Sequence, residues 1–232
     1  MDRSVRALLA RALSGPSYAP TPADLRSVEI AGLRLPLRAT VAITVMVFVL
    51  IFDYSRTFIP DDLIAFDRNP GMQRLQAIDR LVLFGLVPLL VVLIGFRDRP
   101  SRYGLRLGDW RWGLALAVAG CAVMTPIVLA VSGAAEFRAY YAPSWSSLPD
   151  VAATNAIDLT AAEFLFRGFL MFALVRAIGP IGVLVTTLPF IFSHLAKPEL
   201  ELLSTLGGGL AYGLLAWRTG SIIWARWPTP TS

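Results

Sequence analysis

Long apolar runs dominate the chain and predict helices that cross a membrane. Six such runs, bounded by charged or turn-forming residues, cover 39–52, 81–96, 112–135, 151–175, 177–193 and 200–217. A spanning helix needs about 20 apolar residues, and flanking arginines and aromatic residues can lengthen the shorter runs by reaching the headgroups. A seventh run begins at Thr219 and loses its apolar character at Arg226. The pattern predicts an all-α transmembrane bundle of about six spans and a truncated seventh.

The composition supports this class of protein. The chain has 232 residues, of which 56% are hydrophobic and 16% are charged, and its mean hydropathy is +0.62. A soluble domain has about 25% charged residues. A membrane β-barrel would need alternating apolar and polar positions, whereas these runs are continuous.

The distribution of basic residues predicts the orientation. The net charge is +5, and the expected inner loop from Arg97 to Arg111 carries five arginines. Because basic residues next to spans favour the cytoplasmic side, we expect a cytoplasmic N-terminus and no nucleic-acid partner. Residues 1–38 are expected to form a basic tail, either an interfacial helix or a disordered segment, without a removable signal peptide.

Three ionisable residues interrupt the fourth apolar run. They are Asp158, Glu163 and Arg167. Ionisable groups inside a membrane cost several kcal/mol and usually have a partner or a function. Glu163 and Arg167 are four residues apart, so on a helix they share a face and can form an ion pair. This pair is compatible with a structural role in helix packing and with a functional one.

The chain has a single histidine, His194, at the end of the fifth run, four residues after Phe190. A lone histidine at a helix end is more often structural than catalytic. If Glu163 and His194 shared a water-accessible cavity, however, they could together deprotonate a water molecule. The single cysteine, Cys121, lies in an apolar run and excludes a disulfide or a cysteine-based zinc site within one chain.

Several short motifs in the second half share a characteristic order and spacing. They are Tyr103-Gly104-Leu105 with Gly108-Asp109-Trp110, Glu163-Phe164-Leu165-Phe166-Arg167-Gly168, Phe190-x-x-x-His194, Gly209-x-x-x-Gly213, and Arg218-Thr219-Gly220-Ser221-Ile222. From Tyr103 to Ile223 the chain resembles the CAAX protease and bacteriocin-processing family of intramembrane proteins, which includes proteins like CAAX prenyl protease 2. The resemblance implies a protease domain at 103–225, preceded by two transmembrane helices within 39–100.

The resemblance also implies roles for individual residues. Family members are similar in having a Glu-Glu-x-x-x-Arg motif, a Phe-x-x-x-His motif and a later His-x-x-x-Asn-like motif. On this pattern Glu163 and His194 would activate water, and Arg167 would orient Glu163 and hold it ionised. Phe190 would be an auxiliary residue of the same site.

The chain departs from the family pattern at two places. Ala162 stands at the first glutamate position, and no histidine follows Ser221. The C-terminal residues suggest a truncated or frameshifted product, or a true divergence. Asp158 lies four residues before Ala162 and could supply part of the missing carboxylate function, or it could be a solvated residue near the interface.

We therefore expect an intramembrane endopeptidase that hydrolyses a peptide bond in a membrane-associated peptide or protein. The alternative is a catalytically impaired relative that binds a membrane partner or confers bacteriocin immunity. No cofactor is expected, and a divalent metal is the less favoured family alternative because the chain lacks a His-Glu-x-x-His motif. The arginine-rich composition suggests a bacterial inner membrane. The substrate, the cleavage site and the oligomeric state stay open.

Overall fold

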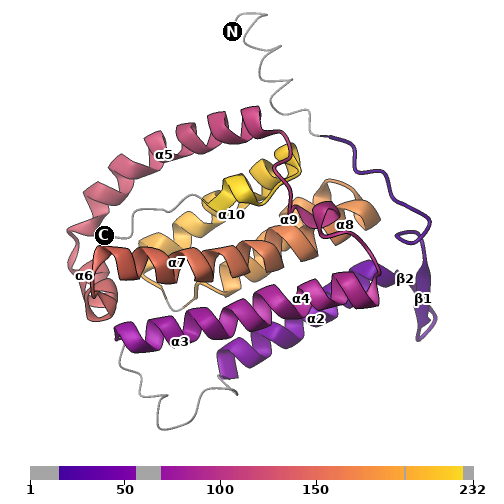
Figure 1. Cartoon of the computed structure of the whole chain (residues 1–232), viewed down its shortest axis with the longest axis horizontal. Helices are drawn as coiled ribbons and strands as arrows, with labels where there is room; N and C mark the ends of the chain where they lie inside the picture. Colours follow the sequence, from indigo (N-terminus) through magenta and orange to yellow (C-terminus); the bar gives the residue numbers. More distant parts are fainter. Residues whose placement is uncertain (1–15, 56–68, 196, 227–232) are drawn as a thin grey trace, which may run out of the picture.

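The computed structural model describes residues 16–55, 69–195 and 197–226. Helices make up most of this part of the chain (Figure 1). The strands and α-helices are β1 Ser27–Ile30, β2 Leu33–Pro36, α2 Leu37–Ser55, α3 Pro70–Arg80, α4 Val87–Leu90, α5 Trp110–Ser132, α6 Ala135–Tyr141, α7 Leu148–Glu163, α8 Met171–Ile178, α9 Ile181–Phe192 and α10 Glu199–Thr219. The π-helical and 3-10 segments are η2 Leu81–Leu86, η3 Val91–Gly95, η4 Pro100–Tyr103, η5 Ala142–Ser144, η6 Phe164–Leu170 and η7 Ile223–Arg226.

Two long helices contain π-helical stretches. One runs from Pro70 to Gly95 through α3, η2, α4 and η3, and the other from Leu148 to Ile178 through α7, η6 and α8. The first begins earlier than the expected start at residue 81. Asn69 caps it by accepting a hydrogen bond from the backbone N–H of Met72 at 2.9 Å, and proline occupies its first turn. The segment expected as a linker before residue 81 is therefore partly helical.

Three helices are long and apolar enough to cross a membrane: Leu37–Ser55, Pro70–Gly95 and Trp110–Ser132. They correspond to the first three expected spans and confirm a helical membrane protein. The expected total of six is not confirmed. Helix α9 has only 12 residues, and α10 begins with two glutamates, Glu199 and Glu201. The helix from Leu148 to Ile178 carries several charges. In place of a seventh span, residues 223–226 form the 3-10 turn η7.

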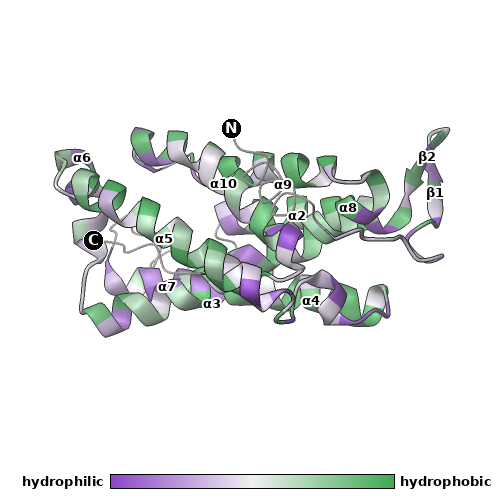
Figure 2. Cartoon of the chain, turned by 90° about the horizontal axis from the view of Figure 1, so that it is seen from above, coloured by the Kyte–Doolittle hydropathy of each residue, from purple (hydrophilic) through white to green (hydrophobic). Residues whose placement is uncertain are grey.

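The packing centre of the bundle is η6, in which every residue is buried. It packs against α2, α9 and α10, while α3 runs beside α7 and α8 packs on α9 (Figure 1). Large apolar side chains are exposed on several helices, for example Phe48, Ile94 and Leu129. Hydrophobic residues are spread along most of the helices (Figure 2). A soluble monomer rarely exposes such extensive apolar surface, whereas a lipid-facing bundle does.

Residues 27–36 form an antiparallel hairpin that the sequence analysis did not predict. Ser27 pairs with Pro36 and Ile30 with Leu33. Ala31 and Gly32 make the two-residue turn with φ values of 50° and 81°, which is the geometry that favours tight hairpins. The segment expected as a basic tail, residues 1–38, thus contains this hairpin and the first residues of α2. Its first 15 residues lie outside the described part of the chain, so the alternatives of an interfacial helix or a disordered tail stay predictions there.

An ionic cluster ties the N-terminal segment to one end of the bundle. We call it the Asp24 cluster, and it consists of Asp24, Arg38, Asp98, Arg102 and Arg176. Asp24, whose side chain is 3% exposed, lies 2.7 Å from Arg38, 2.7 Å from Arg102 and 3.5 Å from Arg176. Asp98 bridges Arg38 at 2.9 Å and Arg102 at 2.6 Å. The cluster therefore joins the start of α2, η4 and the end of α8 to the segment before β1.

Replacing Asp24 by asparagine is expected to destabilise the protein by about 3 kcal/mol, because three guanidinium groups, two of them buried, lose their shared counter-ion. Burial alone would raise the pKa of Asp24, but hydrogen bonds from Thr21, Arg102 and Arg38 outweigh it and hold this pKa well below its usual value. The stabilisation is thus present above the unfolded-state pKa of about 3.9. It is lost as the pH falls below that value, and unfolding in detergent at several pH values would measure it.

The matched control is Asp150→Asn. Asp150 also pairs with an arginine, Arg74, at 2.7 Å, but the two side chains are 26% and 53% exposed. An exposed pair contributes about 0–1 kcal/mol. If both variants unfolded at the same denaturant concentration as the parent protein, the Asp24 cluster would not contribute to stability.

Candidate functional site

Glu163 and Arg167 form a buried ion pair at the centre of the bundle. Glu163 ends α7 and Arg167 lies in η6, and they are 5% and 2% exposed. Arg167 Nη1 donates to Glu163 Oε1 at 2.9 Å. Segments of π-helix inside α-helices occur frequently at functional sites. The sequence spacing of four residues had predicted this contact.

The second carboxylate oxygen of Glu163 is free. Oε2 is buried and has no hydrogen-bond partner among the residues that the structure describes. Buried polar atoms are almost always satisfied, and the exceptions often have a functional explanation. Glu163 therefore presents one oxygen that is fixed by Arg167 and one that can accept a hydrogen bond.

Arg167 is held by contacts with two further helices. Its Nη2 lies 3.5 Å from the carbonyl oxygen of Gly209 on α10, and its Cζ lies 3.7 Å from the centroid of the Phe190 ring on α9. A Cβ atom at Gly209 would lie 2.9 Å from Phe190 Cδ1 and 3.1 Å from Thr187 Cγ2. Glycine is thus needed where α9 and α10 approach each other, which is the packing role expected from small residues in membrane helices.

His194 lies in the turn after α9, and its local contacts define the tautomer. Nδ1 is 2.8 Å from the carbonyl oxygen of Phe190. Because a carbonyl only accepts, Nδ1 carries the proton in this contact, and the lone pair of the neutral ring is on Nε2. Ser193 Oγ donates to the same carbonyl oxygen at 2.7 Å. Nε2 has no hydrogen-bond partner within 16–55, 69–195 and 197–226, so it is available as a base.

Phe190 connects the two parts of the site. Its ring centroid lies 4.4 Å from that of His194 and 3.7 Å from Arg167 Cζ. These two distances together limit the separation between Arg167 Cζ and the His194 ring centroid to 8.1 Å. A chain of contacts therefore runs from Glu163 through Arg167 and Phe190 to His194. Between Glu163 and His194 themselves, the described residues show no direct hydrogen bond.

The structure gives Asp158 a different set of neighbours. Its Oδ1 lies 3.2 Å from Arg80 Nη1, and the same arginine binds Asp53 Oδ1 through Nε at 2.8 Å. Asp158 is 28% exposed at its side chain, so it is neither buried beside Glu163 nor fully solvated. These contacts join α2, α3 and α7. An auxiliary catalytic role for Asp158 stays a prediction.

A second polar cluster adjoins His194 and was missed by the sequence analysis. The backbone N–H of Lys197 donates to the carbonyl oxygen of His194 at 3.0 Å. Lys197 Nζ lies 2.6 Å from Glu201 Oε1, and Tyr141 Oη donates to Glu201 Oε2 at 2.5 Å. The four-residue spacing of Lys197 and Glu201 was a usable signal for their pairing. No sequence pattern points to Tyr141, which comes from α6.

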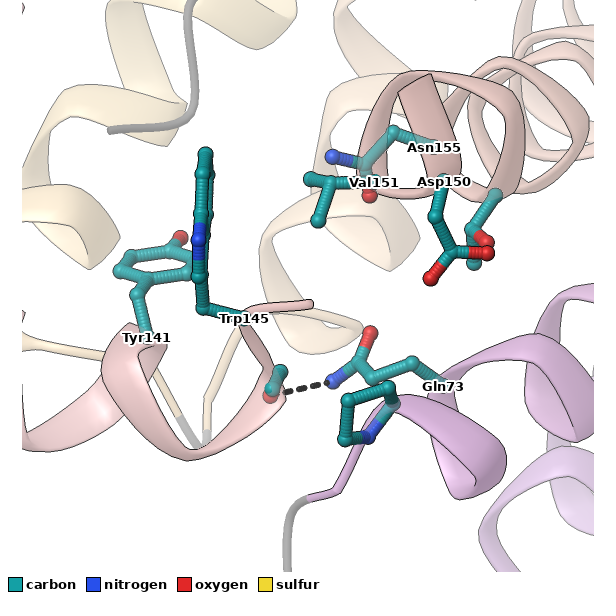
Figure 3. A pocket seen from close by; sticks show the side chains of 9 residues that line it. Gln73, Tyr141, Trp145, Asp150, Val151 and Asn155 are labelled. Carbon is teal, nitrogen blue, oxygen red and sulfur yellow. Dashed lines mark hydrogen bonds between the residues drawn. The ribbon is translucent and has the colours of Figure 1, made fainter. Parts of the chain in front are cut away.

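A cavity lies at the end of the bundle where α3, η5 and α7 meet (Figure 3). Tyr141 and Trp145 stand on one side, with Val151 and Asn155 of α7 opposite them and Gln73 below. Gln73 Nε2 donates to Ser144 Oγ at 3.1 Å across its edge. The residues that line the cavity include neither Glu163 nor His194, so the cavity is separate from the candidate site.

The donor set does not fit the divalent metal that the family resemblance allows. A zinc site usually has three protein ligands. Among the residues whose placement is described, no group of three or more histidine, cysteine, aspartate and glutamate side chains could hold a metal ion. Glu163 and His194 would be two ligands without a third.

The helical bundle, its apolar outer surface and its buried ion pair define a multi-pass membrane protein with a polar site in its interior. Residues 144–227 match the family model described as Rce1-like, type II CAAX prenyl endopeptidase. The matched segment contains Glu163, Arg167, Phe190 and His194, and the match confirms the family resemblance for the motifs within 144–227. The motifs between Tyr103 and Trp110 lie outside it. No curated protein and no solved structure matches the chain.

Proposed function

We propose that the protein is an intramembrane endopeptidase that hydrolyses a peptide bond in a membrane-associated peptide or protein. The observation that carries this proposal is the buried Glu163 carboxylate, which is fixed by Arg167 through one oxygen and free at the other. His194, connected to this pair through Phe190, has a free Nε2. The similarity of residues 144–227 to type II CAAX prenyl endopeptidases supports the same class of reaction.

The two free acceptors match the two hydrogens of a water molecule. In the proposed mechanism, water donates one hydrogen bond to Glu163 Oε2 and the other to His194 Nε2. Glu163 takes a proton as the water oxygen adds to the carbonyl carbon of the substrate. When the C–N bond breaks, protonated Glu163 returns this proton to the leaving amine. Arg167 keeps the carboxylate ionised and oriented before the reaction.

A catalytically impaired relative is the second candidate. Two observations favour it: Ala162 occupies the position of a motif glutamate, and His194 is the only histidine in the chain. Such a protein would bind a peptide or a membrane partner, for example in bacteriocin immunity. Binding would then survive substitution of both Glu163 and His194.

The same proposal places the protein in a cell membrane with its N-terminus in the cytoplasm. The arginines of the Asp24 cluster gather at one end of the bundle, at the start of α2 and the end of α8. The orientation rule for basic residues favours the cytoplasmic side for this end. Protease access to tags in sealed vesicles would test the orientation.

The activity itself is tested with the full chain reconstituted in liposomes that contain a library of membrane-anchored peptides. We expect the protein to cleave at least one peptide, with products identified by mass spectrometry. The variant His194→Gln is expected to lower this cleavage about a hundredfold or more, because it loses the imidazole nitrogen that positions the attacking water for proton transfer. Peptide binding without any cleavage, or full cleavage by His194→Gln at an unchanged unfolding midpoint, would contradict the proposal.

A further inference from the structure

Hydrolysis at the Glu163 site needs a group that polarises the carbonyl of the substrate. In the family pattern this is the task of a later histidine, and the single histidine of this chain is already His194. One preorganised donor to an oxyanion changes the rate by about 10²–10³-fold. The chain must therefore supply another donor if the proposed function is correct, and the following inference rests on that function.

Tyr212 lies on the buried face of α10. The fully buried residues of this helix recur every three or four positions, and those on the face towards the bundle include Thr205, Gly209, Ala216 and Thr219. Tyr212 is seven residues after Thr205 and four before Ala216, so it shares this face. Its side chain is partly buried.

The Tyr212 ring lies beside the contact between α10 and the ion pair. A Cβ atom at Gly208 would be 4.0 Å from Tyr212 Cε2, so the ring leans back along the helix, as long side chains on helices do. The next residue, Gly209, presents the carbonyl oxygen that lies 3.5 Å from Arg167 Nη2. Tyr212 therefore lies on the part of α10 that contacts the ion pair, within electrostatic range of both Glu163 and Arg167.

Two polar groups of opposite character, the Tyr212 hydroxyl and the Glu163 carboxylate, lie within electrostatic range of each other. The Tyr212 hydroxyl makes no hydrogen bond within the described parts of the chain, and neither does Glu163 Oε2. The hydroxyl is a donor and the carboxylate oxygen is an acceptor. A peptide bond undergoing attack by water needs both: an acceptor for the proton of the water, and a donor for the carbonyl oxygen.

We propose that Tyr212 is a catalytic residue that donates a hydrogen bond to the carbonyl oxygen of the scissile peptide bond. As the water oxygen bonds to the carbonyl carbon, the proton passes to Glu163 and the C=O π electrons move to the oxygen. Tyr212 stabilises this oxyanion and keeps its own proton. The C–N bond then breaks, the carbonyl is restored, and the amine leaves with the proton from Glu163.

The first test compares Tyr212→Phe with Tyr140→Phe, a matched loss of one hydroxyl on α6. We expect Tyr212→Phe to lower kcat about a hundredfold, with KM little changed, because the hydrogen bond strengthens only in the transition state. Tyr140→Phe is expected to behave like the parent protein. If kcat of Tyr212→Phe stays within about twofold of the parent while Glu163→Gln is inactive, the role of Tyr212 is overturned and the endopeptidase function stands.

The second test does not need activity. With 3-fluorotyrosine placed at position 212 of the full chain in nanodiscs, the ¹⁹F signal should shift when Glu163 is replaced by glutamine. The same label at position 140 should not respond. If the ¹⁹F signal at position 212 does not shift in Glu163→Gln, the placement of the phenol near the carboxylate is overturned. Absence of cleavage by the parent protein would overturn the endopeptidase function and this role together.

Discussion

Glu163→Gln is expected to reduce kcat for peptide hydrolysis by about a thousandfold. Glutamine has nearly the same shape as glutamate and retains an oxygen that can accept from Arg167. Its amide, however, cannot take a proton from water. Because proton transfer belongs to the transition state, KM should change little. Single-turnover cleavage of a membrane-anchored peptide in liposomes would measure the loss.

The control for this variant is Asp158→Asn, which removes a carboxylate from the same long helix. Asp158 binds Arg80 at 3.2 Å, away from the contacts of Glu163. We expect Asp158→Asn to retain activity within a few-fold, and this result would end the auxiliary hypothesis for Asp158. Equal losses in both variants would show that the substitutions act through the stability of the helix.

Arg167→Met is expected to destabilise the folded protein by about 3–5 kcal/mol, because it leaves the buried Glu163 without its counter-ion. Methionine can fill much of the space between Phe190 and Gly209 without a charge. The double variant Glu163→Gln/Arg167→Met should recover most of the lost stability, since no buried charge is then left unpaired. Equilibrium unfolding in mixed micelles would measure all three proteins.

This set of variants also separates the structural and functional interpretations of the ion pair. If the pair serves packing alone, the double variant should be stable and should behave like the parent protein in the peptide assay. If the pair serves hydrolysis, the double variant should be stable and inactive. If the double variant lost as much stability as the two single variants together, the proposed electrostatic coupling would be contradicted.

The first predicted span was correct in kind but too short, for a physical reason. The apolar run in the sequence begins after Arg38 and ends before Asp53, whereas α2 extends from Leu37 to Ser55. Both charges are buried and paired: Arg38 binds Asp24 at 2.7 Å, and Asp53 binds Arg80 at 2.8 Å. A charged residue marks the end of the predicted span because the sequence does not show its partner. Once the charge is paired, the helix can continue past it.

The spacing of residues in the sequence predicted contacts within one helix. It could not predict contacts between residues that are far apart in the sequence. The four-residue spacing of Glu163 and Arg167 corresponds to the observed 2.9 Å ion pair. The partner of Asp158 is 78 residues away in the sequence. Likewise, Tyr212 comes within electrostatic range of the ion pair because α10 packs against η6. Tyr212 occupies one of the unspecified positions of Gly209-x-x-x-Gly213, so no signal in the sequence points to it.

The π-helical segment η6 has a consequence for the evolution of this fold. It separates α7, which packs on α3, from α8, which packs on α9, within one uninterrupted helix. Each residue advances an α-helix by about 100°. A one-codon deletion anywhere in 164–170 would therefore rotate one half of the helix relative to the other. Arg167 could then no longer contact both Glu163 and Gly209. Length in this short stretch should consequently be under stronger selection than the identity of several of its apolar side chains.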